Sequence, residues 1–221
     1  MVKNEANLLT LIPKEVIEVI ENFNARDYAA CLKELRPLAE QGYPSAQYML
    51  GCMYDDGLGV TQDDKETVKW FQLAAEQGYA CAQYNLGLMY YSTICDQVEQ
   101  DYEEAVKWLR LAAEQGYASA QFMLFTMYAC GEGVTQDDKE AAKWYRLSAE
   151  QDDADAHAQF NLSLCYRDGL GVEKDLEKAF CWYEKATEQD NATTSNIAKY
   201  FEDQKNVLNF EYWKKKSRKN R

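Results

Sequence analysis

Hydrophobic positions recur along most of the chain at the 3.6-residue spacing of an α-helix, and they alternate between two kinds of segment. The apolar face of the first kind, AQYMLGCMY, comprises Ala46, Leu50, Met53 and Tyr54. The apolar face of the second kind, DDKETVKWFQLAAEQG, comprises Thr67, Trp70, Phe71, Ala74 and Ala75. Each segment therefore predicts an amphipathic helix with one face available for packing.

The two segments are repeated in tandem. AEQGYPSAQYMLGCMY at 39–54 returns as AEQGYACAQYNLGLMY at 75–90 and AEQGYASAQFMLFTMY at 113–128, and AEQDDADAHAQFNLSLCY at 149–166 is a diverged copy. The tryptophans of the second segments are separated by 38, 36 and 38 residues and are Trp70, Trp108, Trp144 and Trp182. A helix pair of this length cannot bury its apolar face alone, so the repeats are expected to stack on one another.

Turn and cap residues mark the boundaries of each predicted helix. Paired glycines in DGLGV at 56–60, GEGV at 131–134 and DGLGV at 168–172 predict tight loops with positive φ, and the second repeat lacks them. An aspartate begins each second helix, namely Asp63, Asp101, Asp137 and Asp175. Such N-caps contribute about 1 kcal/mol each. Glu66, Glu104 and Glu140 follow at capping-box spacing, whereas the fourth repeat has Lys178 and predicts a weaker cap.

The repeat divides the chain into successive parts. An N-terminal capping helix region at 1–26 precedes a partial repeat at 27–42 that has only a second helix. Four repeats then occupy 43–188, at approximately 43–78, 79–116, 117–152 and 153–188. A degenerate C-terminal capping repeat with a basic tail is expected at 189–221.

The pattern AEQG, A-x-AQ-[YF]-x-L, DGLGV and D-x-x-[EK] before the tryptophan resembles the Sel1-like repeat family, over residues 27–188. The resemblance implies an all-α fold, a right-handed α-solenoid superhelix of stacked antiparallel helix pairs related to tetratricopeptide arrays. It also implies a scaffold or adaptor role in a bacterial protein. Departures from the pattern are Phe125 in a small-residue position, the second loop and Asp152. Secreted members pair cysteines that recur once per repeat, and the cysteines here show no such recurrence.

Charge is unevenly distributed. The net charge is −13, but the tail at 214–221 holds six basic residues, so the rest of the chain is more acidic still. An acidic body repels nucleic-acid phosphates and favours a partner with basic character. The tail is interpreted as a solvated terminus, with a localisation signal or a nucleic-acid contact as the alternative.

The seven cysteines include no CxxC pair, which argues against a zinc site. Reduced cysteines in a cytoplasmic protein are the first interpretation, and a disulfide-stapled secreted array is the alternative. The N-terminal sequence has no evident signal peptide and no apolar run has the length of a membrane span. Secretion by a signal-independent route stays open.

No motif for catalysis or cofactor binding was found. His157 is the single histidine and lies in an acidic junction, where a surface or packing role is the simpler interpretation. The acidic loop at 55–64 lacks the ligand order of an EF-hand, and neither a P-loop nor an SxxK motif occurs. The sequence therefore predicts no enzyme activity, cofactor or metal.

Positions that vary between repeats on the first helices form the candidate binding surface. By helical spacing they share one face, and we call them the first-helix stripe: Met49, Cys52, Asn85, Leu88, Met123, Thr126, Asn161 and Leu164. Packing against the next repeat is the alternative role. The sequence predicts a monomeric, non-enzymatic interaction module that binds a peptide or protein on the concave surface, with a partner of basic character favoured. The alternatives are an immunity or regulatory protein that neutralises a cognate toxin or enzyme and, more remotely, a secreted effector or hydrolase-like enzyme.

Overall fold

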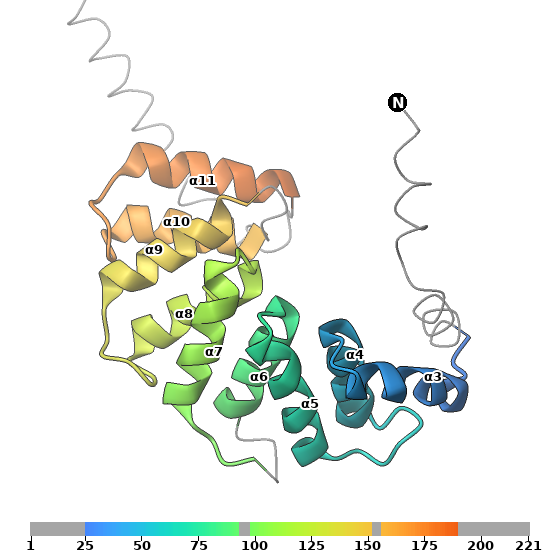
Figure 1. Ribbon diagram of the computed structural model, residues 1–221. Coiled ribbons are helices and arrows are strands. Elements are labelled where there is room, and N and C mark those ends of the chain that lie inside the picture. The colour runs from blue at the N-terminus through green and yellow to red at the C-terminus, as the bar shows by residue number, and fades with distance from the viewer. Residues whose placement is uncertain (1–24, 93–97, 152–155, 190–221) are drawn as a thin grey trace, which may run out of the picture. The chain divides into compact units, whose positions relative to one another are not determined.

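The computed structural model describes residues 25–92, 98–151 and 156–189, and this part of the chain is helical with no strand. The helices are α3 (Tyr28–Glu40), α4 (Pro44–Asp56), α5 (Asp64–Glu76), α6 (Ala80–Tyr91), α7 (Tyr102–Glu114), α8 (Ala118–Cys130), α9 (Asp138–Ala149), α10 (Ala156–Asp168) and α11 (Leu176–Gln189) (Figure 1). The chain divides into two compact units, Met1–Ala112 and Ala113–Arg221, here called unit 1 and unit 2. The all-α fold of packed helix pairs is thereby confirmed.

Several predicted features lie outside the described residues. They are the N-terminal capping helix, the C-terminal capping repeat with its basic tail, Cys95 in the second loop, and the irregular junction after Gln151.

In unit 1, α3, α4, α5 and α6 pack in chain order (Figure 1). One hydrophobic cluster joins α3 and α4 through the fully buried Cys31, Leu35 and Leu50, and it includes Trp70 from α5. A second cluster joins α5 and α6 and receives Trp108 from α7. The residues predicted to line both helix faces are therefore the ones that the core buries.

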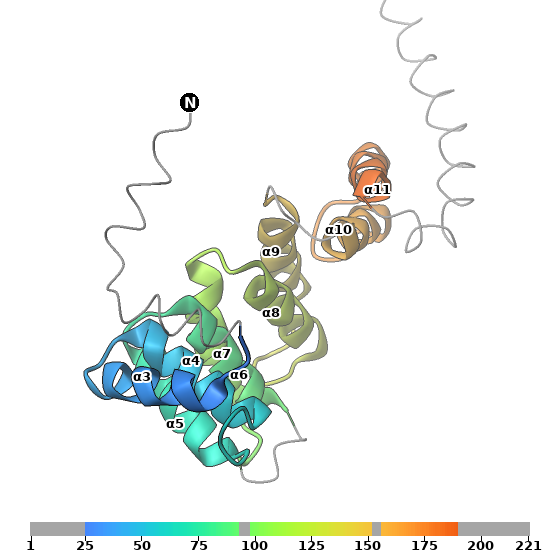
Figure 2. The same cartoon turned by 90° about the vertical axis from the view of Figure 1, so that its right-hand side faces the viewer.

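In unit 2, α8 packs on α9, α9 on α10, and α10 on α11, an order that both views show (Figures 1 and 2). Its core contains Tyr145, Leu162 and Ala179, each fully buried. These three side chains come from the apolar faces that the sequence pattern predicts for their helices.

The small-residue position of the first helices sets how the two helices of a pair meet. A Cβ atom at Gly51 would lie 2.6 Å from the Phe71 ring, so glycine allows this ring to contact the α4 backbone. Phe125 occupies the same position in α8, and its ring stacks on Tyr145 with the ring centroids 4.0 Å apart. The third repeat therefore replaces a close backbone approach with an aromatic pair.

The predicted N-caps are present. The Asp63 carboxylate accepts hydrogen bonds from the backbone N–H groups of Lys65 and Glu66, at 3.0 and 3.2 Å. Asp101, Asp137 and Asp175 cap their helices in the same way. The glycines of the three loops have positive φ, as predicted.

The predicted capping box is wrong at Glu66. Its carboxylate does not reach back to the Asp63 N–H; it accepts hydrogen bonds from Lys69 Nζ and from Trp70 Nε1, the latter at 3.0 Å. The Asp63 N–H donates to the Tyr54 carbonyl oxygen at 3.1 Å, and the other three repeats form the same backbone bond. Because a carbonyl oxygen from the preceding helix already accepts from that N–H, the Glu66 carboxylate is available to accept a hydrogen bond from the Trp70 indole.

On α4, α6 and α8 a buried glutamine bonds to a backbone carbonyl oxygen eight residues earlier in the chain. Gln47, Gln83 and Gln121 are 3–4% exposed, and their Nε2 atoms donate to the carbonyl oxygens of Ala39, Ala75 and Ala113. In unit 2, the amide oxygen of Gln121 is also paired, because Gln151 Nε2 donates to Gln121 Oε1 at 2.9 Å. The AlaGln pair of the repeat therefore supplies the polar link between successive helix pairs.

Candidate functional site

The first-helix stripe lies on α4 and α6 in unit 1 and on α8 and α10 in unit 2. All eight of its side chains are partly exposed, so none is sealed in the core. Met49, Cys52 and Leu164 also pack against core clusters. The stripe therefore combines surface exposure with some packing.

In unit 1, Tyr48 binds two stripe residues. Asn85 Nδ2 donates to the Tyr48 hydroxyl at 3.2 Å, and the Cys52 thiol is hydrogen bonded to the same side chain. The Tyr48 ring in turn stacks on Phe71, with ring centroids 5.6 Å apart. Asn85 and Cys52 of the stripe therefore both have a hydrogen-bond partner within unit 1.

In unit 2, Phe122 occupies the position that Tyr48 has in unit 1, and it has no hydroxyl group. The Asn161 amide, which corresponds to that of Asn85, has no hydrogen-bond partner among the residues that the structure describes. Phe122 is 36% exposed and packs against Phe125 and Tyr145. Within the described residues, this part of unit 2 presents a partly exposed aromatic ring and a side-chain amide without a hydrogen-bond partner.

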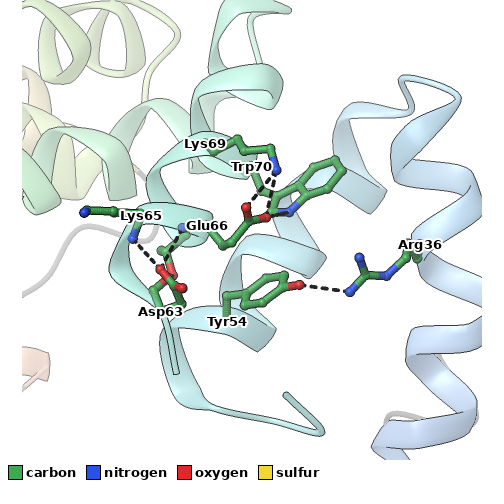
Figure 3. Close-up of polar contacts among 8 residues, drawn as sticks. Arg36, Tyr54, Asp63, Lys65, Glu66, Lys69 and Trp70 are labelled. Atoms are coloured by element: carbon green, nitrogen blue, oxygen red, sulfur yellow. Dashed lines mark hydrogen bonds and ion pairs between the residues drawn. The ribbon is translucent and has the colours of Figure 1, made fainter. Parts of the chain in front are cut away.

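A pocket that the sequence did not indicate lies on another side of unit 1. It has a volume of about 740 Å³ and lies between α3, the loop that follows α4, and α5. Its lining residues are Arg36, Glu40, Tyr54, Val60, Thr61, Asp63, Glu66, Lys69 and Trp70. Arg36 Nη2 donates to the Tyr54 hydroxyl at 2.9 Å, while Lys69 and Trp70 bond to Glu66 (Figure 3).

The corresponding position in unit 2 holds a smaller pocket of about 370 Å³, and one of its lining residues has the opposite charge to its equivalent in unit 1. Lys178 replaces Glu66, pairs with Asp175 at 3.3 Å and lies over the Tyr166 ring. The Lys178 backbone N–H, first among several contacts, lowers the pKa of Asp175. The two units therefore present chemically different surfaces at equivalent places of the repeat.

Comparison with known families gives a direct match. The Sel1 repeat model matches residues 44–79, 82–117, 118–153 and 156–191, more than half of the chain. The chain belongs to the Sel1 repeat family. Proteins built from Sel1 repeats are generally protein-interaction modules, and the fold is typically a non-enzymatic scaffold.

Two solved Sel1 repeat structures are similar to this one. A Sel1 repeat protein from Oxalobacter formigenes is 37% identical with a TM-score of 0.72, over 78% of this chain and 70% of that chain. The protective antigen c5321 of uropathogenic Escherichia coli strains is 41% identical with a TM-score of 0.71, over 76% of this chain. The match covers 35% of that antigen, so this chain corresponds to about a third of it. A comparison with curated proteins gave no match.

The described part of the chain shows neither a metal-binding cluster nor a membrane-spanning helix. Over 25–92, 98–151 and 156–189, no cluster of three or more histidine, cysteine or acidic side chains is placed to hold a metal ion. Within the same ranges, none of the Sel1 repeat helices is both long enough and apolar enough to cross a membrane. The side chain of His157 lies outside the described part, so the interpretation of this residue stays a prediction.

The cysteines of the Sel1 repeats should differ sharply in reactivity. Burial is the main factor that raises the pKa of both Cys52 and Cys165 to about 11. Only roughly one thiol in a thousand would then be ionised at pH 8. Cys130 and Cys181 are exposed, so iodoacetamide should alkylate them first. Mass spectrometry of quenched time points measures the order, and Cys52 reacting as fast as Cys130 would contradict it.

Proposed function

We propose that this Sel1 repeat chain is a non-enzymatic adaptor that binds a peptide or protein surface on its first-helix stripe. The observation that carries the proposal is the difference between equivalent positions in the two units. The Tyr48 hydroxyl accepts a hydrogen bond from the Asn85 amide in unit 1, whereas Phe122 has no hydroxyl and the Asn161 amide has no partner among the described residues of unit 2. A side-chain amide with both donor and acceptor free suits the backbone of a bound segment.

Apolar anchors beside that amide would supply most of the affinity. Met123 and Phe122 lie next to each other on α8 and are partly exposed, and Leu164 is partly exposed on α10. Interface energy usually concentrates in a few such apolar or aromatic contacts, with polar groups giving specificity. The net charge of −13 favours a partner with basic character, mainly through faster association.

A paired substitution tests the proposal. The native host's proteins are captured on the immobilised full chain and identified by mass spectrometry, and binding of the purified partner is then measured by calorimetry. Leu88→Glu combined with Met123→Glu introduces a charge into the stripe of each unit. We expect it to weaken binding at least about a hundredfold, because each charge would lose its water at an apolar contact.

The control is Leu73→Glu combined with Leu147→Glu. These leucines are 38% and 37% exposed on the second helices α5 and α9, so this control makes the same chemical change outside the stripe. Both double variants should keep the wild-type circular dichroism spectrum. Equal binding by the stripe variant and the wild type would refute the assignment of the stripe.

The identity of the captured partner distinguishes the finer roles. Recovery of a single toxin or enzyme whose activity the chain inhibits would favour an immunity or regulatory function over general scaffolding. We also propose that the protein is cytoplasmic, since its cysteines show no recurrence once per repeat, and that it acts as a monomer. Light scattering and cell fractionation test these two points.

A further inference from the structure

Arg36 bonds differently from the residues at its repeat position in α5 and α9. Gln72 Nε2 donates to Glu76 Oε1 at 2.9 Å, and Arg146 Nε lies 3.7 Å from Glu150 Oε1, so both bond to a glutamate four residues ahead. Arg36 instead donates to the Tyr54 hydroxyl at 2.9 Å, and within the described part of the chain no carboxylate pairs with it (Figure 3). Within the described residues its guanidinium is therefore hydrogen bonded to Tyr54 but not neutralised by a carboxylate.

The position of this charge is fixed by three elements of unit 1. Arg36 extends from α3 toward Tyr54 on α4, and Trp70 on α5 lines the same pocket (Figure 3). Val60, in the loop between α4 and α5, adds an apolar wall to the pocket of about 740 Å³. The guanidinium therefore borders a hollow that has both aromatic and aliphatic surface.

The acidic groups of the pocket are largely occupied already. Asp63 accepts hydrogen bonds from two backbone N–H groups at the start of α5. Glu66 accepts from Lys69 and from the Trp70 indole, and Lys69 also covers the Trp70 ring, with Nζ 5.2 Å from its centroid. A ligand cation would find both the indole face and this carboxylate taken, whereas most N–H donors of Arg36 have no partner among the described residues.

We propose that this pocket binds an acidic side chain from an extended segment of a protein partner. The ligand carboxylate would pair with the guanidinium fork of Arg36, a geometry that allows two parallel charge-assisted hydrogen bonds. An apolar side chain next to it in the partner would contact Val60 and the Tyr54 ring. The charge complementarity is local, because Glu40 lies at the pocket edge and the chain as a whole is acidic.

This site is separate from the first-helix stripe. Tyr54 follows Cys52 by two residues on α4, and residues two apart on a helix do not share a face. The proposal therefore stands or falls independently of the binding function proposed for the stripe.

A blocked peptide is a sufficient probe. The full chain, labelled with ¹⁵N, is titrated with acetyl-Leu-Glu-Leu-amide, and the indole N–H of Trp70 and the Nε–H of Arg36 are followed by nuclear magnetic resonance. We expect saturable shifts at millimolar concentrations, as for a small contact without long-range attraction. The acetyl-Leu-Gln-Leu-amide peptide, which lacks the charge, should bind at least tenfold more weakly.

Three variants locate the binding. Arg36→Ala should weaken binding of the glutamate peptide at least tenfold, and Arg36→Lys, which keeps the charge but not the fork, several-fold. Arg146→Ala, the control at the same repeat position, should leave the affinity unchanged, and thermal melting confirms that each variant is folded. The proposal is overturned if the glutamine peptide binds equally well, if Arg36→Ala binds like the wild type, or if neither peptide shifts these resonances. A response only to Leu-Leu with a free carboxyl terminus would overturn the choice of a side-chain carboxylate.

Discussion

Replacing Gly171 with alanine should lower the free energy of unfolding of unit 2 by at least about 3 kcal/mol. Gly171 has a φ of +67°, and a Cβ atom there would lie 1.7 Å from the Asp138 carbonyl oxygen and 2.8 Å from Ala142 Cβ. The loop before α11 therefore rests directly on the first turn of α9. Because the obstructing atom belongs to a helix backbone, relief of the clash requires the loop to separate from α9.

Gly116→Ala provides the matched control in the same unit. Gly116 also has positive φ, at +89°, but nothing lies within 4 Å of its added Cβ atom. This variant should show only the backbone strain of about 1–2 kcal/mol. Urea unfolding followed by circular dichroism gives the free energies, and hydrogen exchange locates the loss to α9, α10 and α11. Equal destabilisation by the two variants would show that the contact with Asp138 contributes nothing.

Features that depend on local chemistry could be predicted from the sequence. The aspartate caps, the glycine loops and the apolar faces each follow from residues within one helical turn of one another, and repetition made the pattern unambiguous. The capping-box prediction failed because the Asp63 N–H has a partner outside its own helix, while Glu66 has competing donors within its own helix. The Tyr54 carbonyl, nine residues earlier, satisfies the Asp63 N–H, and the Trp70 indole competes for Glu66.

The pocket could not be predicted for a similar reason. Arg36 reaches Tyr54 across 18 positions of sequence, and nothing in the residues around Arg36 indicates that it avoids Glu40. The contact between Asn85 and Tyr48 spans 37 positions. Comparing repeats could have found the latter, because Tyr48 becomes Phe122 while Asn85 remains asparagine as Asn161.

The recurring glutamines are a sequence signal from which buried polar links could have been predicted. A polar residue at the same place in each apolar segment requires a buried partner, because an unpaired buried amide is costly. The structure supplies that partner as a backbone carbonyl of the preceding helix. The second large prediction follows from this arrangement.

Replacing Gln121 with glutamate should destabilise unit 2 by about 3–5 kcal/mol at pH 7. Gln121 is 4% exposed, and its Nε2 donates to the Ala113 carbonyl oxygen at 3.0 Å. An ionised carboxylate has no proton to donate, so it would face that oxygen while still accepting the bond from Gln151. The chain would have to bury an uncompensated charge or separate α8 from the helix before it.

The loss of stability caused by Gln121→Glu should become smaller as the pH falls. Burial disfavours the charged form, so the folded-state pKa of the introduced carboxyl group lies above its unfolded value of about 4.3. The variant therefore loses stability relative to the wild type as the pH rises from about 4.3 to the folded-state pKa, at about 1.4 kcal/mol per pH unit. Below that range the protonated acid can again donate to Ala113, and the two proteins should unfold at similar urea concentrations.

Gln136→Glu is the control for added charge. Gln136 is exposed in the loop before α9, so the same change there should alter stability by less than about 0.5 kcal/mol at every pH. Gln121→Met separates the two contributions in the core, because it removes the donor without adding charge and should cost about 1–3 kcal/mol with little dependence on pH. If the glutamate variant tracked the methionine variant across the whole titration, the carboxylate would have escaped to solvent, and the glutamine link would not be as tightly enclosed as its burial indicates.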